Sequence, residues 1–159
     1  MEIRFACDRD IPGMLRLLMQ VGQVHHEIRP DLFRSGAQKY DEMALKELLK
    51  DPNRPILAAV EENNLLGYCF CILRTTKDDP VLRDQKSLYI DDLCVDENIR
   101  GKHVGKALYE AAVAYAREIG CDTVTLNVWC GNDSAMKFYE SRGMKPRKIY
   151  METSLEETC

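Results

Sequence analysis

A glycine- and lysine-rich turn between a strand-like run and an amphipathic helix constrains the fold of this chain most strongly. The run from Ser87 to Val95 is mostly apolar, and the stretch that begins near Val104 repeats its apolar residues at helical spacing. The residues from Ile99 to Leu108 place glycines and basic side chains at the junction. Backbone N–H groups at a helix N-terminus favour a bound anion, and glycine lets the anion approach closely. The pattern predicts an anion-binding turn, with a solvated helix cap as the plainer alternative.

Two further segments extend this pattern. A strand-like run, Thr123–Asn127, follows the helix, and the residues Asn132–Met144 come after it. In this order and spacing, the segments resemble the GNAT superfamily of acyl-CoA-dependent N-acetyltransferases. Arg100–Gly105 resembles its Arg-x-x-Gly-x-Gly pyrophosphate loop, and Asn132–Met144 resembles its Asn-x-x-Ala-x-x-Phe-Tyr-x-x-x-Gly-Phe signature. His103 departs from the pattern, because the loop usually has its first glycine there.

The resemblance implies acetyl-CoA as co-substrate and assigns residues to it. A histidine at position 103 is expected to need helix-like backbone angles, which the start of the following helix would supply. Asn132 also reads as a helix N-cap, and the two roles can coexist. The implied cofactor contacts are the backbone of Leu93, Cys94 and Val95, the turn residues Arg100, Gly101, Lys102, His103, Val104, Gly105 and Lys106, and the side chain of Asn132.

Two residues are implied to be catalytic. Tyr139 matches the family tyrosine that protonates the departing thiolate, and a phenol of pKa ~10 is close enough to a thiol of pKa ~8.5 for useful transfer. Asp91 matches the acidic group that holds or deprotonates the amine. Asp92, a water relay and a purely structural strand-edge carboxylate remain alternatives. As neighbours on a strand, Asp91 and Asp92 are expected to point to opposite faces.

Composition limits the class of protein. With 159 residues the chain is expected to form a single N-acetyltransferase domain, 1–159, and its net charge of −4 argues against nucleic-acid binding. The seven cysteines contain no Cys-x-x-Cys pair, which favours a cytoplasmic location. No apolar run reaches the ~18 residues that span a bilayer, so no membrane partner is expected. No metal is expected either, because His25 and His26 are adjacent and point about 100° apart on a helix.

The apolar periodicity predicts an α/β fold. The resemblance implies the GNAT-like version of this fold: a mixed, mostly antiparallel central sheet flanked by helices and splayed at the acyl-CoA site. Cys94 lies in an apolar strand, where a thiol is expected to be inert rather than an acyl carrier. Expected strands are a short one at Ile3–Phe5, then 56–60, 65–73, 87–95, 123–128 and a final one at 144–151. The first expected helix is capped by Asp8 or Asp10, and the others cover 40–50, begin at Val104, and cover 133–141.

The sequence therefore predicts an N-acetyltransferase that moves an acetyl group from acetyl-CoA directly to a primary amine of a small molecule or a protein. The second hypothesis is a non-catalytic acyl-CoA-binding or sensing module on the same fold, which would need no proton donor such as Tyr139. A nucleotide-binding protein ranks last, because the chain has neither a Walker Gly-Lys-Ser/Thr nor a Gly-x-Gly-x-x-Gly fingerprint. The sequence does not specify the acceptor, and it leaves a homodimer open.

Overall fold

The computed structural model describes residues 1–99 and 101–155. The chain forms two compact units, Met1–Asn127 and a second that begins at Val128. In the described part of the chain, no helix has the length and apolar character needed to cross a membrane.

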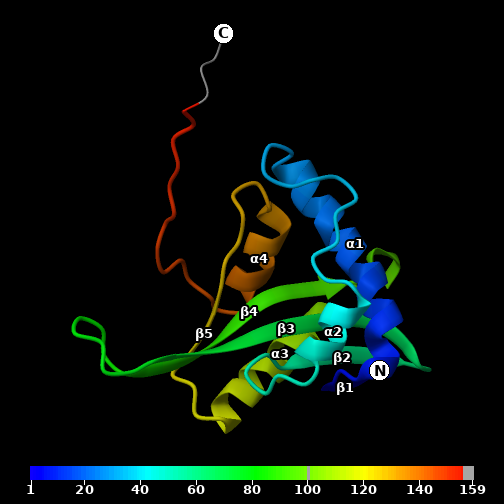
Figure 1. Ribbon diagram of the computed structural model, residues 1–159, viewed down its shortest axis with the longest axis horizontal. Coiled ribbons are helices and arrows are strands. Elements are labelled where there is room, and N and C mark those ends of the chain that lie inside the picture. The colour runs from blue at the N-terminus through cyan, green and yellow to red at the C-terminus, as the bar shows by residue number, and fades with distance from the viewer. Residues whose placement is uncertain (100, 156–159) are drawn as a thin grey trace. The chain divides into compact units, whose positions relative to one another are not determined.

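The first unit is built on one five-stranded sheet in the order β1-β2-β3-β4-β5. Neighbouring strands are antiparallel except for β4 and β5, which run parallel because helix α3 connects them. Figure 1 shows the long β3–β4 hairpin extending beyond the other strands. The strands are β1 (Glu2–Phe5), β2 (Ile56–Glu61), β3 (Asn64–Thr76), β4 (Gln85–Val95) and β5 (Thr123–Leu126).

Helices cover both faces of this sheet. Helices α1 (Ile11–Ile28) and α2 (Glu42–Leu48) share a buried cluster with one set of alternate strand residues, including Tyr68, Phe70 and Cys94. Helix α3 (Val104–Glu118) covers the opposite face (Figure 1). There, a side chain in place of Gly67 would lie within 3.4 Å of Val104 and Leu108. The alternation of strand side chains thus provides one core on each side of the sheet.

Two predicted helix signals are confirmed in the first unit, but the Asp10 side chain makes no capping hydrogen bond to α1. Pro12 lies in the first turn of α1, where its missing N–H has no helical partner to lose. Asp41 caps α2 by accepting a hydrogen bond from the Ala44 amide at 2.8 Å. Gly120 follows α3 with φ of +74°, which is the left-handed conformation that ends helices. Two short 3-10 turns are present. Asp8–Asp10 precedes α1, and Glu97–Ile99 precedes the glycine- and lysine-rich turn before α3, which we call the anion turn.

The second unit contains helix α4 (Asp133–Ser141), as predicted. The Asn132 side chain caps it by accepting a hydrogen bond from the Ala135 amide at 3.2 Å. Gly143, at φ of +85°, lies just beyond its end. The signature segment is therefore a helix with both of the predicted terminal signals.

The predicted final strand at 144–151 is wrong. Within the described residues 144–155, no strand or helix is present. Ile149, Tyr150 and Met151 are 83%, 97% and 83% exposed. Their apolar character suggested a strand, but a strand also needs a hydrogen-bonded neighbour, and this segment has no ladder partner among the described residues. Strand β5 is also shorter than predicted and ends at Leu126.

Candidate active site

The two strands that pair with β4, β3 and β5, do so over different lengths. The antiparallel ladder with β3 continues to Val95, which pairs with Gly67. The parallel ladder with β5 ends where Ile90 pairs with Leu126. Among the described residues, the sheet therefore has no ladder on the β5 side of β4 beyond Ile90. The predicted opening of the sheet beside Leu93–Val95 is confirmed.

A β-bulge lies at the start of this opening. Phe70 pairs with Asp92, and the next residue, Cys71, pairs with Ile90, so Asp91 is the extra residue on β4. A bulge bends the strand locally and re-aims its side chains. Asp91 and Asp92 consequently do not follow the simple alternation predicted from the sequence. Both carboxylates meet groups on the side of the sheet that α1 and α2 cover.

The Asp91 carboxylate pairs with a lysine from the connection between α1 and α2. The Lys39 ammonium lies 2.6 Å from Asp91 Oδ2, and the two side chains are 48% and 17% exposed. Burial lowers the pKa of Lys39, but the hydrogen bond and the charge of Asp91 outweigh this and raise the pKa overall. Lys39 is therefore a cation at neutral pH, held against the bulge.

The Asp92 carboxylate lies deeper. The Tyr68 hydroxyl, in a side chain with no exposed surface, donates a hydrogen bond to Asp92 Oδ2 at 2.8 Å. Burial raises the pKa of Asp92 to about 6, although the Tyr68 hydroxyl and the Lys39 charge oppose the rise. Burial and the Asp92 charge also raise the pKa of Tyr68, which keeps the phenol protonated as the donor. The bulge thus presents two carboxylates with different surroundings.

The strand beyond the bulge can offer its backbone but not its thiol. The Cys94 side chain is 5% exposed, and its Sγ lies 3.6 Å from the Leu17 carbonyl oxygen of α1. This placement agrees with the prediction of an inert thiol in an apolar core. Leu93 and Val95, on either side of Cys94, are half-buried.

Asp96 anchors the turn that leaves β4. Its carboxylate pairs with the Arg16 guanidinium of α1 and accepts hydrogen bonds from the Asn98 amide and side chain, each at 3.0 Å. Burial opposes ionisation, but these partners outweigh it and lower the pKa of Asp96 to about 2. The sequence analysis did not single out Asp96 or Arg16, because they are 80 residues apart.

The anion turn is exposed and partly left-handed. Arg100 lies outside the described residues. Gly101 has φ of +87°, and a side chain built there would meet nothing within 4 Å. His103 has φ of 61° and ψ of 15°, so the predicted helix-like conformation is wrong. His103 thus has left-handed backbone angles directly before α3 begins. Histidine is among the non-glycine residues that adopt the left-handed region more often.

Helix α3 begins directly after the turn. Val104 is 2% exposed, so this residue can offer only its backbone to a ligand. Gly105 is half-buried, while Lys102 and Lys106 are exposed. The Lys106 ammonium lies 3.8 Å from the Glu110 carboxylate one turn later. The turn therefore combines first-turn amides, a helix dipole and lysines, which together suit a phosphate group.

The remaining predicted site residues belong to the second unit. Asn132 is the N-cap of α4, so its capping role is confirmed. Tyr139 is half-buried, and its ring lies 5.1 Å from that of Phe138 in an edge-to-face arrangement. No group of three or more potential metal-ligating side chains occurs in the part of the chain that the structure describes.

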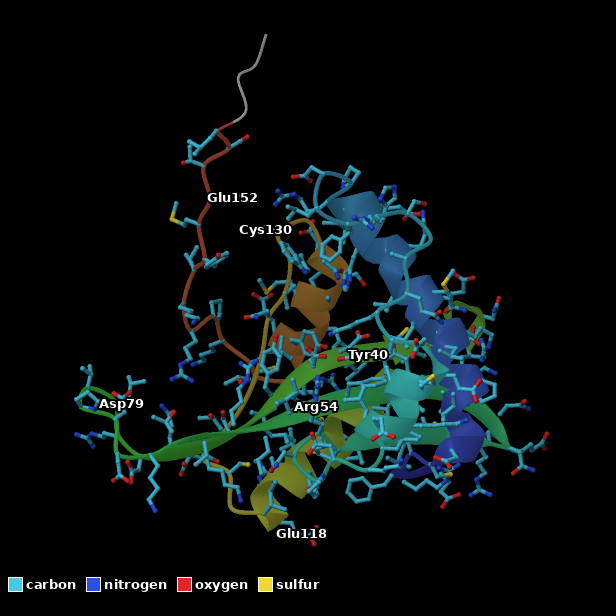
Figure 2. The ribbon with its side chains drawn as sticks, in the orientation of Figure 1. Tyr40, Arg54, Asp79, Glu118, Cys130 and Glu152 are labelled. Carbon is cyan, nitrogen blue, oxygen red and sulfur yellow. The ribbon has the colours of Figure 1, made fainter. Side chains whose placement is uncertain are left out.

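Sequence reasoning missed the groups that surround the two carboxylates. Lys39 and Tyr40 lie in a connection without periodicity, and Tyr68 reads as an ordinary core residue of a strand. In the structure, the Tyr40 ring stacks on Phe70 at 5.9 Å, and its hydroxyl accepts a hydrogen bond from Arg54 at 3.1 Å. Figure 2 shows Tyr40 and Arg54 in the same region of the first unit. The sequence places Lys39 and Tyr40 at the start of an expected helix, with no signal that they reach the sheet.

Comparison with known proteins identifies the family. The model of the acetyltransferase (GNAT) family matches residues 21–144. Human N-acetyltransferase 8B is 30% identical over 118 residues, which are 67% of this chain and 49% of the human protein. The match therefore spans about half the length of that relative.

Solved structures support the same fold. A variant of the BH1408 protein from Bacillus halodurans is 33% identical, covers 98% of this chain and 100% of its own, and has a TM-score of 0.93. An aminoglycoside acetyltransferase from an uncultured soil metagenomic sample, solved with sisomicin, is 21% identical and has a TM-score of 0.70, with 98% and 96% of the two chains covered. At 21% identity, the similarity to the aminoglycoside acetyltransferase concerns the fold alone.

Proposed function

Because the chain belongs to the GNAT acetyltransferase family, we propose that it transfers an acetyl group from acetyl-CoA directly to a primary amine. The observation that carries the proposal is the end of the β4–β5 ladder at Ile90, which leaves the rest of β4 without a partner on that side among the described residues, between two carboxylates and the turn before α3. A thioester and its acceptor can meet at such an opening. The proposed location is the cytoplasm, in keeping with the cysteine pattern.

The strand, the turn and α3 fit the proposed cofactor. The backbone of Leu93, Cys94 and Val95 would pair with the pantetheine arm as an added strand would, since the β5 ladder ends before them. The diphosphate would be held by Arg100, by the exposed turn residues Gly101, Lys102 and His103, and by Val104, Gly105 and Lys106 in the first turn of α3. Asn132 would reach the cofactor arm while it caps α4. Acetyl-CoA supplies the activated acetyl group.

The proposed role of Asp91 is to hold the acceptor amine and take its proton, directly or through water. An alkylammonium of pKa ~10.4 requires about 4.6 kcal/mol to become neutral at pH 7, so a nearby carboxylate is needed most for such acceptors. The neighbouring Asp92, whose pKa is raised to about 6, is the alternative base, because a group that titrates near neutral pH transfers protons efficiently.

The proposed role of Tyr139 is to donate a proton to the departing sulfur. The protonated phenol then returns a neutral thiol to solution, and the tyrosinate recovers its proton from water. Cys94 takes no part in this scheme, because its thiol faces the core beside Leu17. Transfer therefore occurs from the thioester to the amine without an acyl-protein intermediate.

A panel of amines tests the proposal. Thiol release from acetyl-CoA is measured with and without each of several alkylamines, amino acids, aminoglycosides, polyamines and peptides. We expect release that depends on at least one primary amine. Tight acetyl-CoA binding with no amine-dependent release by any class would instead support the non-catalytic acyl-CoA-binding module.

A further inference from the structure

The carboxylate proposed to hold the acceptor amine already holds an amine from its own chain. Lys39 Nζ lies 2.6 Å from Asp91 Oδ2, and the two residues are 52 positions apart in the sequence. Asp92 is the second charged group that acts on Lys39 from the same strand. The other lysines paired at comparable distance, Lys46 and Lys50, contact glutamates close to them in the sequence. The pairing of Lys39 is therefore a tertiary contact rather than a local surface pair.

The segment that carries Lys39 is held on both sides. On one side, the Gln38 amide group donates a hydrogen bond to the Leu15 carbonyl oxygen of α1 at 3.2 Å. On the other, Tyr40 stacks on Phe70 and accepts the hydrogen bond from Arg54. We call residues 38–40 the latch. It places a primary ammonium group at the bulge while the lysine side chain remains 48% exposed, so the side chain has room to swing away.

We propose that Lys39 occupies the position of the acceptor's ammonium group, so that the natural acceptor is an alkylammonium and Lys39 is its internal competitor. The inference rests on the proposed role of Asp91. A carboxylate oxygen that is paired with Lys39 at hydrogen-bond distance is not available to a second ammonium group. The Lys39 side chain therefore indicates the group that the site selects, which is a primary ammonium on an unbranched alkyl chain.

Because the acceptor must first displace Lys39 from Asp91, the lysine lowers the apparent affinity for the acceptor. An ion pair that is half-exposed is weak, because water screens it and the long side chain loses freedom. The apparent dissociation constant of the acceptor is the intrinsic one divided by the fraction of molecules in which Asp91 is available. We therefore expect removal of the lysine charge to tighten binding about two- to tenfold.

Binding of n-butylammonium to the protein without acetyl-CoA tests this inference. The probe is titrated against wild type, Lys39→Met, Lys39→Arg and Lys46→Met, and amide chemical shifts are followed by NMR. Lys46→Met removes the same charge from a lysine that is paired with Glu42 and does not contact Asp91. The spectrum of each free variant reports whether it is folded, and n-butanol serves as the uncharged probe.

We expect Lys39→Met to bind n-butylammonium two- to tenfold more tightly than wild type, with the largest shifts at Asp91 and Asp92. Lys39→Arg and Lys46→Met should bind as wild type does, n-butanol should not produce these shifts, and Lys39→Met combined with Asp91→Asn should lose the gain. Equal binding by wild type and folded Lys39→Met, or shifts remote from the bulge, would overturn the inference. Acetyl transfer is measured separately, so failure of this inference can be distinguished from failure of the proposed function.

Discussion

Asp91 and Asp92 are adjacent in the sequence but have different physical surroundings. Asp91 is an extra residue on β4, opposite the step from Phe70 to Cys71 on β3, and this bulge turns both carboxylates towards the same side of the sheet. Asp91 meets a cation from the latch, whereas Asp92 meets the buried hydroxyl of Tyr68. Because their partners differ, each residue has its own testable behaviour.

The first prediction concerns Asp91. If it takes the proton of the amine, Asp91→Asn should depress the rate at neutral pH and recover part of it at higher pH, where more of the amine is already neutral. The measurement is kcat/KM for the best amine from about pH 6.5 to 9.5. A loss of the same size at every pH would assign Asp91 to substrate positioning instead.

The second prediction concerns the stability contributed by Asp92. The pKa of its folded form is about 6, above the ordinary 3.8, so between these values the folded state binds more protons than the unfolded state. Stability must therefore fall as pH rises from about 4 to about 6, and the loss remains above pH 6. Asp92→Asn removes this charge, so we expect it to be more stable than wild type by on the order of 2 kcal/mol at pH 7.

Urea unfolding of wild type and Asp92→Asn at pH 3.5 to 7.5 measures this difference. The gap between the two free energies of unfolding should widen across pH 4–6 and then remain constant. A gap that is independent of pH would show that Asp92 is ionised in the folded protein at its ordinary pKa.

The third prediction concerns Tyr139. Its replacement by phenylalanine removes one oxygen and keeps the edge-to-face contact with Phe138. We expect turnover to fall by about 10²- to 10⁴-fold, the usual range of acid–base catalysis, with acetyl-CoA affinity little changed. Turnover is measured with a good acceptor, and acetyl-CoA binding is measured separately. Unchanged turnover would remove Tyr139 from the mechanism.

Among the elements, those with a strong local pattern were predictable. Helix α3 combines a regular apolar stripe with Gly120 at its end, and α4 combines the Asn132 cap with Gly143. These signals act within a few residues, so the sequence contains them in full. The divergence of β4 from β5 came instead from the resemblance to a known family.

Other features depend on distant partners and were not predictable. The segment at 144–151 has apolar residues typical of a strand but no ladder among the described residues. The bulge at Asp91 forms where the register between β3 and β4 shifts after Phe70. The sequence of either strand alone does not reveal this shift. Lys39 meets Asp91 only because the α1–α2 connection crosses to the sheet. Sequence reasoning thus found the strand that carries the two carboxylates but not the groups that contact them.

The fourth prediction concerns the turn between β4 and α3. Asp96 ties it to α1 through Arg16 and to Asn98, which lowers the pKa of Asp96 to about 2. Because the pKa is lower in the folded state, this stabilisation is present above about pH 4 and disappears as pH falls towards 2. Asp96→Asn should therefore reduce stability by about 1–2 kcal/mol at pH 7 and raise KM for acetyl-CoA, with kcat little changed.

Urea unfolding at pH 7 and at pH 2.5, together with steady-state kinetics, tests the role of Asp96. The stability difference between wild type and Asp96→Asn should be much smaller at the lower pH. A fall in kcat with an unchanged KM would show that Asp96 does not act by positioning the turn.

The whole molecule combines the fold of an acetyltransferase family with a site that we propose accepts a primary amine. The chain belongs to the GNAT family, and its first unit opens one edge of β4 between a pair of carboxylates and an anion turn. The match to human N-acetyltransferase 8B spans 49% of that protein, and the name of this relative gives a reaction type but no acceptor. The central claim is direct transfer from acetyl-CoA to a primary amine.

The most direct test follows the acetyl group itself. The protein is incubated with acetyl-CoA carrying ¹³C in the acetyl group and with the best amine from the panel, and thiol, amide product and intact protein are quantified by mass spectrometry. The account predicts one labelled N-acetyl product for each thiol released and no labelled protein intermediate. Thiol release with labelled acetate instead of amide, or label retained on Cys94, would contradict it.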